Sequence, residues 1–121
     1  MSKITKKTNP QLISLIVRLK DQSHTENAAI WKTVANRLDK PTRAHPRVNL
    51  GQISRHTVEG EVILVPGKVL GSGLLNHAVT VAALAFSESA KARITDNGGE
   101  AITISTLMDA VPKGTNVRIM G

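Results

Sequence analysis

The sequence predicts an α/β fold in a single domain, and three observations lead to this prediction. Hydrophobic residues recur at helical spacing in the first part of the chain, short runs of β-branched residues follow in the second part, and short helical patterns separate those runs. Alternating strands and helices form a sheet that the helices cover. A chain of 121 residues with 40% hydrophobic content suits one domain, spanning residues 1–121, with residues 1–8 as a basic N-terminal arm.

Two helices are predicted first. Asn9 and Pro10 are typical of a helix start, because Asn caps the first turn and Pro fits into it. The hydrophobic positions that follow are spaced at i, i+3, i+4 and i+7: Leu12, Leu15, Ile16 and Leu19. We expect this helix to end at residues 21–23, and the capping-box spacing of residues 23–26 to start a second helix. That helix carries Trp31, which we expect in the core rather than stacked on a base.

Strands are predicted from about residue 60 onward. Residues 62–65 form a continuous apolar run before Pro66 and Gly67, so residues 66–73 are expected to form a turn and a flexible crossing. The further strands are expected at residues 79–84, 101–104 and 117–120. Short helices are expected from Asn49, after a cap at Ser87, and after a cap at Ser105.

The positive charge is concentrated in the first half of the chain. The whole chain carries 16 Lys and Arg against 9 Asp and Glu, a formal net charge of +7. Residues 1–57 contain 11 basic and 3 acidic residues, whereas residues 58–121 contain 5 basic and 6 acidic residues. A basic half joined to a neutral half is typical of a protein that binds a polyanion, nucleic acid above all.

One loop in the basic half stands out. Residues 39–47 contain two prolines, the cations Lys40, Arg43 and Arg47, and a single acidic residue, Asp39. Proline reduces the entropy that a loop loses when it is ordered, so this loop is well suited to lie along a phosphate backbone. The alternative is a surface loop that only contributes solubility, which would normally include more acidic residues.

The sequence gives little support to an enzyme. There is no Cys, and the four His residues are scattered, so we expect no disulfide, no metal site and no cofactor. Ser54 with His56, or Glu59 with Glu61, form incomplete catalytic groupings without a third member or an oxyanion loop. No apolar stretch is long enough to span a membrane, and the N-terminus lacks a secretory signal, so we expect a cytoplasmic protein.

The aromatic content narrows the kind of nucleic acid. Trp31 and Phe86 are the only aromatic residues of the types Phe, Trp and Tyr. Modules that bind single-stranded RNA stack bases on several such rings. Recognition is therefore expected to use the phosphates and 2′-hydroxyls of folded RNA. A free-standing chromatin or RNA-chaperone protein remains an alternative that the charge permits.

Several sequence blocks together resemble one family. These blocks are Ser54-Arg55-His56-Thr57, Val65-Pro66-Gly67-Lys68-Val69-Leu70-Gly71-Ser72-Gly73, Val79-Thr80-Val81-Ala82-Ala83 and Phe86-Ser87-Glu88-Ser89-Ala90. The chain is similar over almost its whole length to ribosomal protein eighteen of archaeal and eukaryotic large subunits. The short length resembles the archaeal members. The family shares its fold with the C-terminal domain of bacterial ribosomal protein fifteen, so the resemblance implies an irregular arrangement of the same kind.

The resemblance implies a structural role without catalysis. A member of this family would bind and stabilise folded large-subunit ribosomal RNA and contact neighbouring large-subunit ribosomal proteins, with no membrane and no small-molecule substrate involved. The predicted RNA contacts, with the loop residues ahead of the helical ones, are Lys6, Lys7, Arg37, Lys40, Arg43, Arg47, Arg55, His56 and Lys68. For Lys68, a plain structural turn is an equally good interpretation of the surrounding glycines.

Overall fold

The computed structural model describes residues 9–121, apart from the side chain of Thr42. The predicted N-terminal arm, with Lys6 and Lys7, lies outside the described residues. The described part of the chain forms an α/β fold, as predicted, and its elements follow one another in this order: α1 (Pro10–Glu26), α2 (Ala29–Leu38), the short 3-10 helix η1 (Thr42–Ala44), β1 (Arg47–Asn49), α3 (Leu50–His56), β2 (Val62–Leu70), β3 (Thr80–Phe86), α4 (Glu88–Asp96), β4 (Glu100–Thr103), α5 (Ile104–Ala110) and β5 (Val117–Ile119).

The five strands of the described residues form one parallel sheet with β2 at its centre. β2 pairs with β3 on one side, and β3 pairs with β4. The other side of β2 is divided between two short strands: β5 pairs with residues 62–64, and β1 pairs with residues 68–70. The sheet is irregular here, because two short strands share one edge of β2.

Pro66 and Gly67 lie inside β2, so the turn predicted for residues 66–73 is wrong in its first half. Proline has no backbone N–H and is normally excluded from a central strand. Here β5 ends opposite Leu64, β1 begins opposite Lys68, and a register shift between Val65 and Lys68 interrupts the pairing with β3. Pro66 therefore lies where neither neighbouring strand is in register with it, and β2 continues past it.

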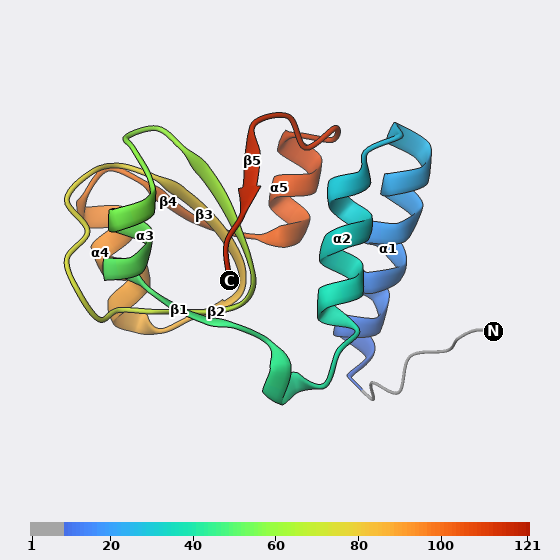
Figure 1. Ribbon diagram of the computed structural model, residues 1–121, viewed down its shortest axis with the longest axis horizontal. Coiled ribbons are helices and arrows are strands. Elements are labelled where there is room, and N and C mark those ends of the chain that lie inside the picture. The colour runs from blue at the N-terminus through green and yellow to red at the C-terminus, as the bar shows by residue number, and fades with distance from the viewer. Residues whose placement is uncertain (1–8) are drawn as a thin grey trace.

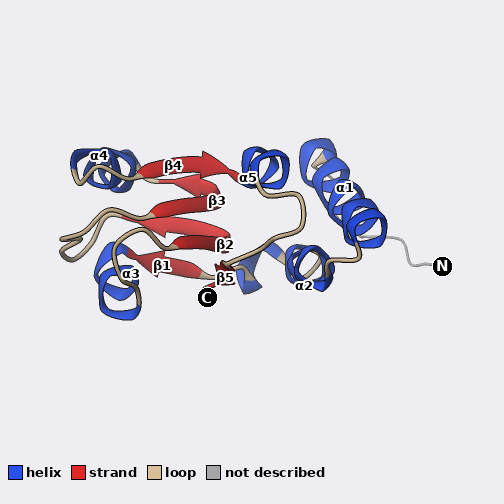
Figure 2. Cartoon of the chain, turned by 90° about the horizontal axis from the view of Figure 1, so that it is seen from above, coloured by secondary structure: helices blue, strands red, loops and turns tan. Residues whose placement is uncertain are grey.

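Helices cover both faces of the sheet. α1, α2 and α5 lie on one side, and α3 and α4 lie on the other (Figures 1 and 2). Leu64 of β2 packs in the first core with Trp31 of α2, which is fully buried as predicted. The adjacent Ile63 packs in the second core with Ile94 of α4. Successive residues of a strand point to opposite faces, so a parallel sheet of this kind builds two cores.

Two predicted helix boundaries are wrong. α1 continues through residues 21–26, and it ends at Asn27, whose φ of 52° is the left-handed conformation that terminates helices. The capping-box pattern of residues 23–26 is thus part of the last turns of α1. In α5 the cap is Thr103, whose Oγ1 accepts the Thr106 N–H, rather than Ser105. Capping patterns are short, and neighbouring hydroxyl residues compete for the same role.

Candidate RNA-binding surface

Two predicted contact residues are neighbours on adjacent strands. Arg47 begins β1, and its partner in the register with β2 is Lys68. Both residues are exposed. Val48 and Val69, which follow them, are buried on the side of α3 and α4. Because side chains alternate along strands, Arg47 and Lys68 project together from the opposite face. The strand β1 is three residues long and was not predicted, so sequence alone did not reveal this pair.

The helices leave this part of the face uncovered. The core on the side of α1, α2 and α5 takes its sheet residues from the earlier parts of the strands, such as Leu64 and Ala82. Further along, the residue of β3 in register with Lys68 is Ala85, which is exposed. The sheet is thus longer than its helical cover. Its open end presents two cations beside a small side chain, so a large partner can approach closely.

The loop that leads into β1 is tied to the body of the protein. The Lys68 N–H donates to the Pro46 carbonyl over 3.0 Å, and the His45 ring forms a hydrogen bond of 3.0 Å from Nε2 to the Leu38 carbonyl oxygen. Gly67 makes the close approach possible, because a Cβ there would lie 2.0 Å from the Pro46 carbonyl oxygen. These contacts hold the loop before any partner binds.

We define the basic strip as Arg43, Arg47 and Lys68. Arg43 is exposed in η1, which follows α2 and precedes β1 along the chain. Lys40, in the same loop, is also exposed. In the described part of the chain the ion pairs are those of Arg18 with Asp109 and Arg118 with Glu61, so no member of the basic strip is neutralised by a carboxylate.

The remaining predicted contacts do not gather at the strip. Arg37 is half-buried, and its Nη1 donates to the Gly121 carbonyl over 2.7 Å, so this guanidinium has a structural partner. Arg55 and His56 are exposed in the last turn of α3. The His56 carbonyl accepts a hydrogen bond from Arg118 of β5, which places a cation at the C-terminal end of α3.

A structural arginine in the second half was missed by the sequence analysis. Arg93 of α4 donates from Nη1 to the carbonyl oxygens of Gly71 and Gly73, over 2.5 Å and 3.2 Å. Gly73 has a φ of +86°, and a Cβ on it would lie 2.6 Å from the Gly51 Cα. The crossing after β2 is therefore fastened to α3 and α4. The partners of Arg93 are backbone carbonyl groups, so the spacing of side chains in the sequence could not predict these hydrogen bonds.

One member of each incomplete catalytic grouping has a structural partner. The Ser54 hydroxyl donates to Asn76 Oδ1 over 3.1 Å. The Glu61 carboxylate accepts the Val58 N–H over 2.7 Å and lies 3.7 Å from Arg118. Among the described residues, no group of three His, Cys, Asp or Glu residues could hold a metal ion. No helix in this part of the chain is long and apolar enough to cross a membrane.

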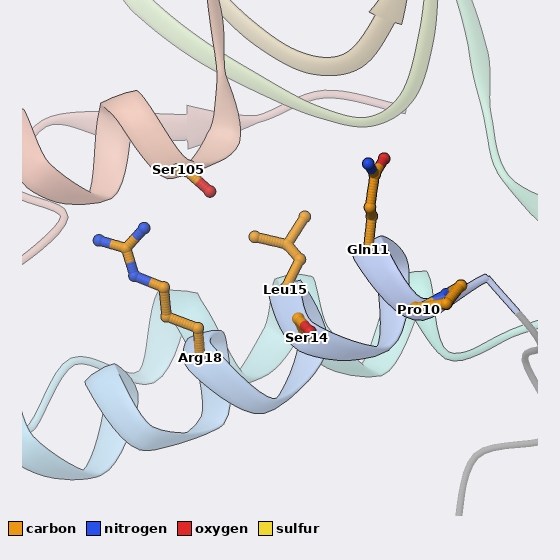
Figure 3. Close-up of a pocket in the computed structure, with 6 residues that line it drawn as sticks. All are labelled: Pro10, Gln11, Ser14, Leu15, Arg18 and Ser105. Atoms are coloured by element: carbon orange, nitrogen blue, oxygen red, sulfur yellow. The ribbon is translucent and has the colours of Figure 1, made fainter.

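A hollow of about 380 Å³ lies between α1 and α5 (Figure 3). Leu15 and Gln11 of α1 face Ser105 of α5 across it, and Arg18 lies at one end. The Arg18 guanidinium is paired with Asp109 of α5. The charge at this hollow is thus neutralised, so the side of α1 that faces α5 is not a candidate for binding a polyanion.

These features define a class of protein: a small basic α/β domain with an exposed cationic strip and no catalytic grouping in the described residues, which is typical of structural nucleic-acid-binding proteins. The family model described as "Ribosomal protein 60S L18 and 50S L18e" matches residues 1–121. The chain belongs to this family of structural, non-enzymatic ribosomal proteins, which confirms the resemblance seen in the sequence.

Archaeal relatives are similar over nearly their whole length. The "Large ribosomal subunit protein eL18" of Methanosphaerula palustris is 56% identical over 115 residues, which cover 95% of each chain. The protein of the same name from Methanothermobacter thermautotrophicus is 51% identical, covering 98% of this chain and 97% of its own. That of Haloarcula marismortui is 48% identical, covering 94% and 97%.

Proposed function

We propose that this protein binds and stabilises folded large-subunit ribosomal RNA through phosphate contacts made by the basic strip. It acts within the large ribosomal subunit in the cytoplasm, supports translation as a structural constituent, and contacts neighbouring ribosomal proteins. The names of its relatives support the location in the large subunit. The single observation that carries the RNA-binding part is the exposed pair of Arg47 and Lys68 on a sheet face without helical cover.

The geometry favours phosphate over base recognition. Arg donates through a planar fork that matches two phosphate oxygens, and Lys acts as a compact point charge. Neither group can read a base in the deep major groove of an RNA helix. Each phosphate that a cation neutralises releases condensed counterions into solution. Binding is therefore expected to be strong at low salt and to weaken steeply as the salt concentration rises.

The hydrogen bonds that hold the loop contribute to affinity. A loop that is ordered before binding loses less conformational entropy when it meets the RNA. The bonds from Lys68 to Pro46 and from His45 to Leu38 fix the path from α2 to β1. Arg43 and Arg47 are therefore presented on a stiff segment. Contacts by Lys6, Lys7, Arg37, Lys40, Arg55 and His56 stay predictions.

The test is equilibrium binding to large-subunit ribosomal RNA transcribed from the organism's own gene, over a range of salt concentrations. The variant Arg47→Gln/Lys68→Gln removes two charges and keeps polar side chains. If each cation neutralises one phosphate, the slope of log affinity against log salt falls in magnitude by about 1.4 to 1.8. Circular dichroism establishes that the variant is folded.

The matched control is Lys91→Gln/Lys113→Gln, which removes two exposed charges from α4 and from the turn before β5. Arg93 is unsuitable as a control, because it holds the crossing after β2. We expect the control to bind like the unchanged protein. Equal losses in both variants would show that only net charge matters and would overturn the assignment to the basic strip.

A further inference from the structure

A second cationic surface lies on the helical hairpin of α1 and α2; among the predicted contacts only Arg37 lies on these helices, and it does not line this surface. A groove of about 600 Å³ runs between α1 and α2, and we call it the hairpin groove. Its lining residues are Lys20, Ser23, His24, Asn27, Lys32 and Asn36. Ser23 is half-buried, and the other five are exposed. The four residues from α1 and its cap are spaced at i, i+3, i+4 and i+7, so they share one face of that helix.

Every side chain that lines the hairpin groove is polar. The set comprises two ammonium groups, an imidazole, two carboxamides and a hydroxyl, and it contains no carboxylate. All of these groups can donate hydrogen bonds. A phosphate group offers oxygens that only accept hydrogen bonds in return. The chemistry of the lining therefore matches a phosphate backbone.

The cations of the hairpin groove are not neutralised within the described residues. The ion pairs there involve Arg18 and Arg118, and the side chains of Lys20 and Lys32 form none. Like charges held on two sides of one groove repel each other, and this repulsion raises the free energy of the unbound protein. An anion between them reverses the sign of the interaction. The two sides of α1 differ in this respect, because Arg18, on the side that faces α5 in Figure 3, is paired with Asp109.

The length of the hairpin groove suits several phosphates rather than one. Lys20 and Asn27 are seven residues apart, which corresponds to a rise of about 10 Å along a helix. A strand of double-helical DNA advances by about 3.4 Å along the helix axis for each nucleotide, and a strand of an RNA helix advances by a similar, somewhat shorter step. The groove is thus about as long as three nucleotides. A small inorganic anion would leave most of its donors without a partner.

We propose that the hairpin groove is a second binding site for the phosphate backbone of folded RNA, separate from the basic strip. This inference rests on the proposed function, since it assumes that the partner is ribosomal RNA. The basic strip lies on η1, β1 and β2, whereas the hairpin groove lies between α1 and α2, two helices that pack outside the sheet in Figures 1 and 2. With both sites occupied, the protein contacts RNA at the sheet and at the helical hairpin.

The first measurement uses the same RNA and the same salt titration as above. The variant Lys20→Gln/Lys32→Gln is expected to lower the magnitude of the salt slope by about 1.4 to 1.8. The control Lys91→Gln/Lys113→Gln removes the same charge elsewhere. A loss in the groove variant that is no larger than in the control overturns the proposal. Both lysines are exposed, so the variant should unfold at a temperature no lower than that of the unchanged protein.

The second measurement reports proximity inside the assembled subunit. The chain has no Cys, so single substitutions allow an iron chelate to be attached at one position, from which hydroxyl radicals cleave nearby RNA. Asn36→Cys reports on the hairpin groove, Asn49→Cys in β1 on the basic strip, and Thr95→Cys on α4 serves as the control. All three positions are exposed.

The outcomes separate the two proposals. RNA cleavage from positions 36 and 49, but not from position 95, supports both sites. Cleavage from position 49 alone overturns the hairpin groove, because a protein neighbour or solvent then occupies it, and leaves the basic strip intact. Cleavage from position 36 alone overturns the basic strip. An absence of cleavage from all three positions overturns the proposed function itself.

Discussion

Replacing Gly67 with Ala tests the link between the fold and the basic strip. Gly67 lies in β2 where the chain passes closest to Pro46, just before β1. An added Cβ would lie 2.0 Å from the Pro46 carbonyl oxygen and 3.0 Å from its carbonyl carbon and nitrogen. Ordinary van der Waals contact begins near 3.4 Å. The obstacle is backbone, so the segment around Pro46 must move away from β2.

The cost follows from the contacts that this movement breaks. The Lys68 N–H to Pro46 carbonyl hydrogen bond of 3.0 Å is lost, at about 1 kcal/mol. Overpacking against a rigid neighbour adds about 1 to 3 kcal/mol. We therefore expect Gly67→Ala to lower the free energy of unfolding by about 2 to 4 kcal/mol. The same shift moves Arg47 away from Lys68, so RNA affinity should also fall.

Chemical denaturation followed by tryptophan fluorescence measures the change, because Trp31 is the only Trp and is fully buried. Gly60→Ala is the matched control. Gly60 has a φ of +87°, and an added Cβ there would meet nothing within 4 Å, so the substitution introduces backbone strain of about 1 to 2 kcal/mol without a clash. A loss at Gly67 of less than about 1 kcal/mol, or one smaller than at Gly60, would refute the steric argument.

Two further substitutions test interactions that stabilise the fold outside the basic strip. Trp31→Phe removes the hydrogen bond of 2.7 Å from Nε1 to the Pro112 carbonyl and leaves a small cavity. The free energy of unfolding should therefore fall by about 1 to 3 kcal/mol, as measured by circular dichroism during denaturation. An unchanged free energy of unfolding would contradict this prediction. Arg93→Ala releases the carbonyls of Gly71 and Gly73, so amide hydrogen exchange should become faster in residues 71–76 than in the rest of the chain, and Lys91→Ala should leave it unchanged.

The positions of the helices and strands followed mainly from local patterns. Asn9 caps α1 as predicted, accepting the Gln11 N–H at its Oδ1 over 2.9 Å, and Ser87 caps α4 by accepting the Ala90 N–H over 3.2 Å. A cap and the hydrophobic face that follows lie within a few residues of each other. Their physical cause is therefore visible in a short window of sequence.

The path through Pro66 could not be predicted in the same way. A proline next to a glycine favours a turn in almost any local context. Whether β2 continues depends on where β1 and β5 end beside it, and those strands come from residues 47–49 and 117–119. The same holds for Arg93, because its partners are carbonyl groups of a loop that precedes β3.

The sequence by itself determined the fold class, the family and the concentration of charge in residues 1–57, because these depend on composition, periodicity and motifs. Only the tertiary structure decided which cations lie close together. It set Arg47 beside Lys68 through strand register, and it brought Lys20 and Lys32 to one groove through helix packing. Both arrangements join residues that are distant along the chain. Which residues become neighbours depends on how the two hydrophobic cores pack, and that packing exists only in the folded chain.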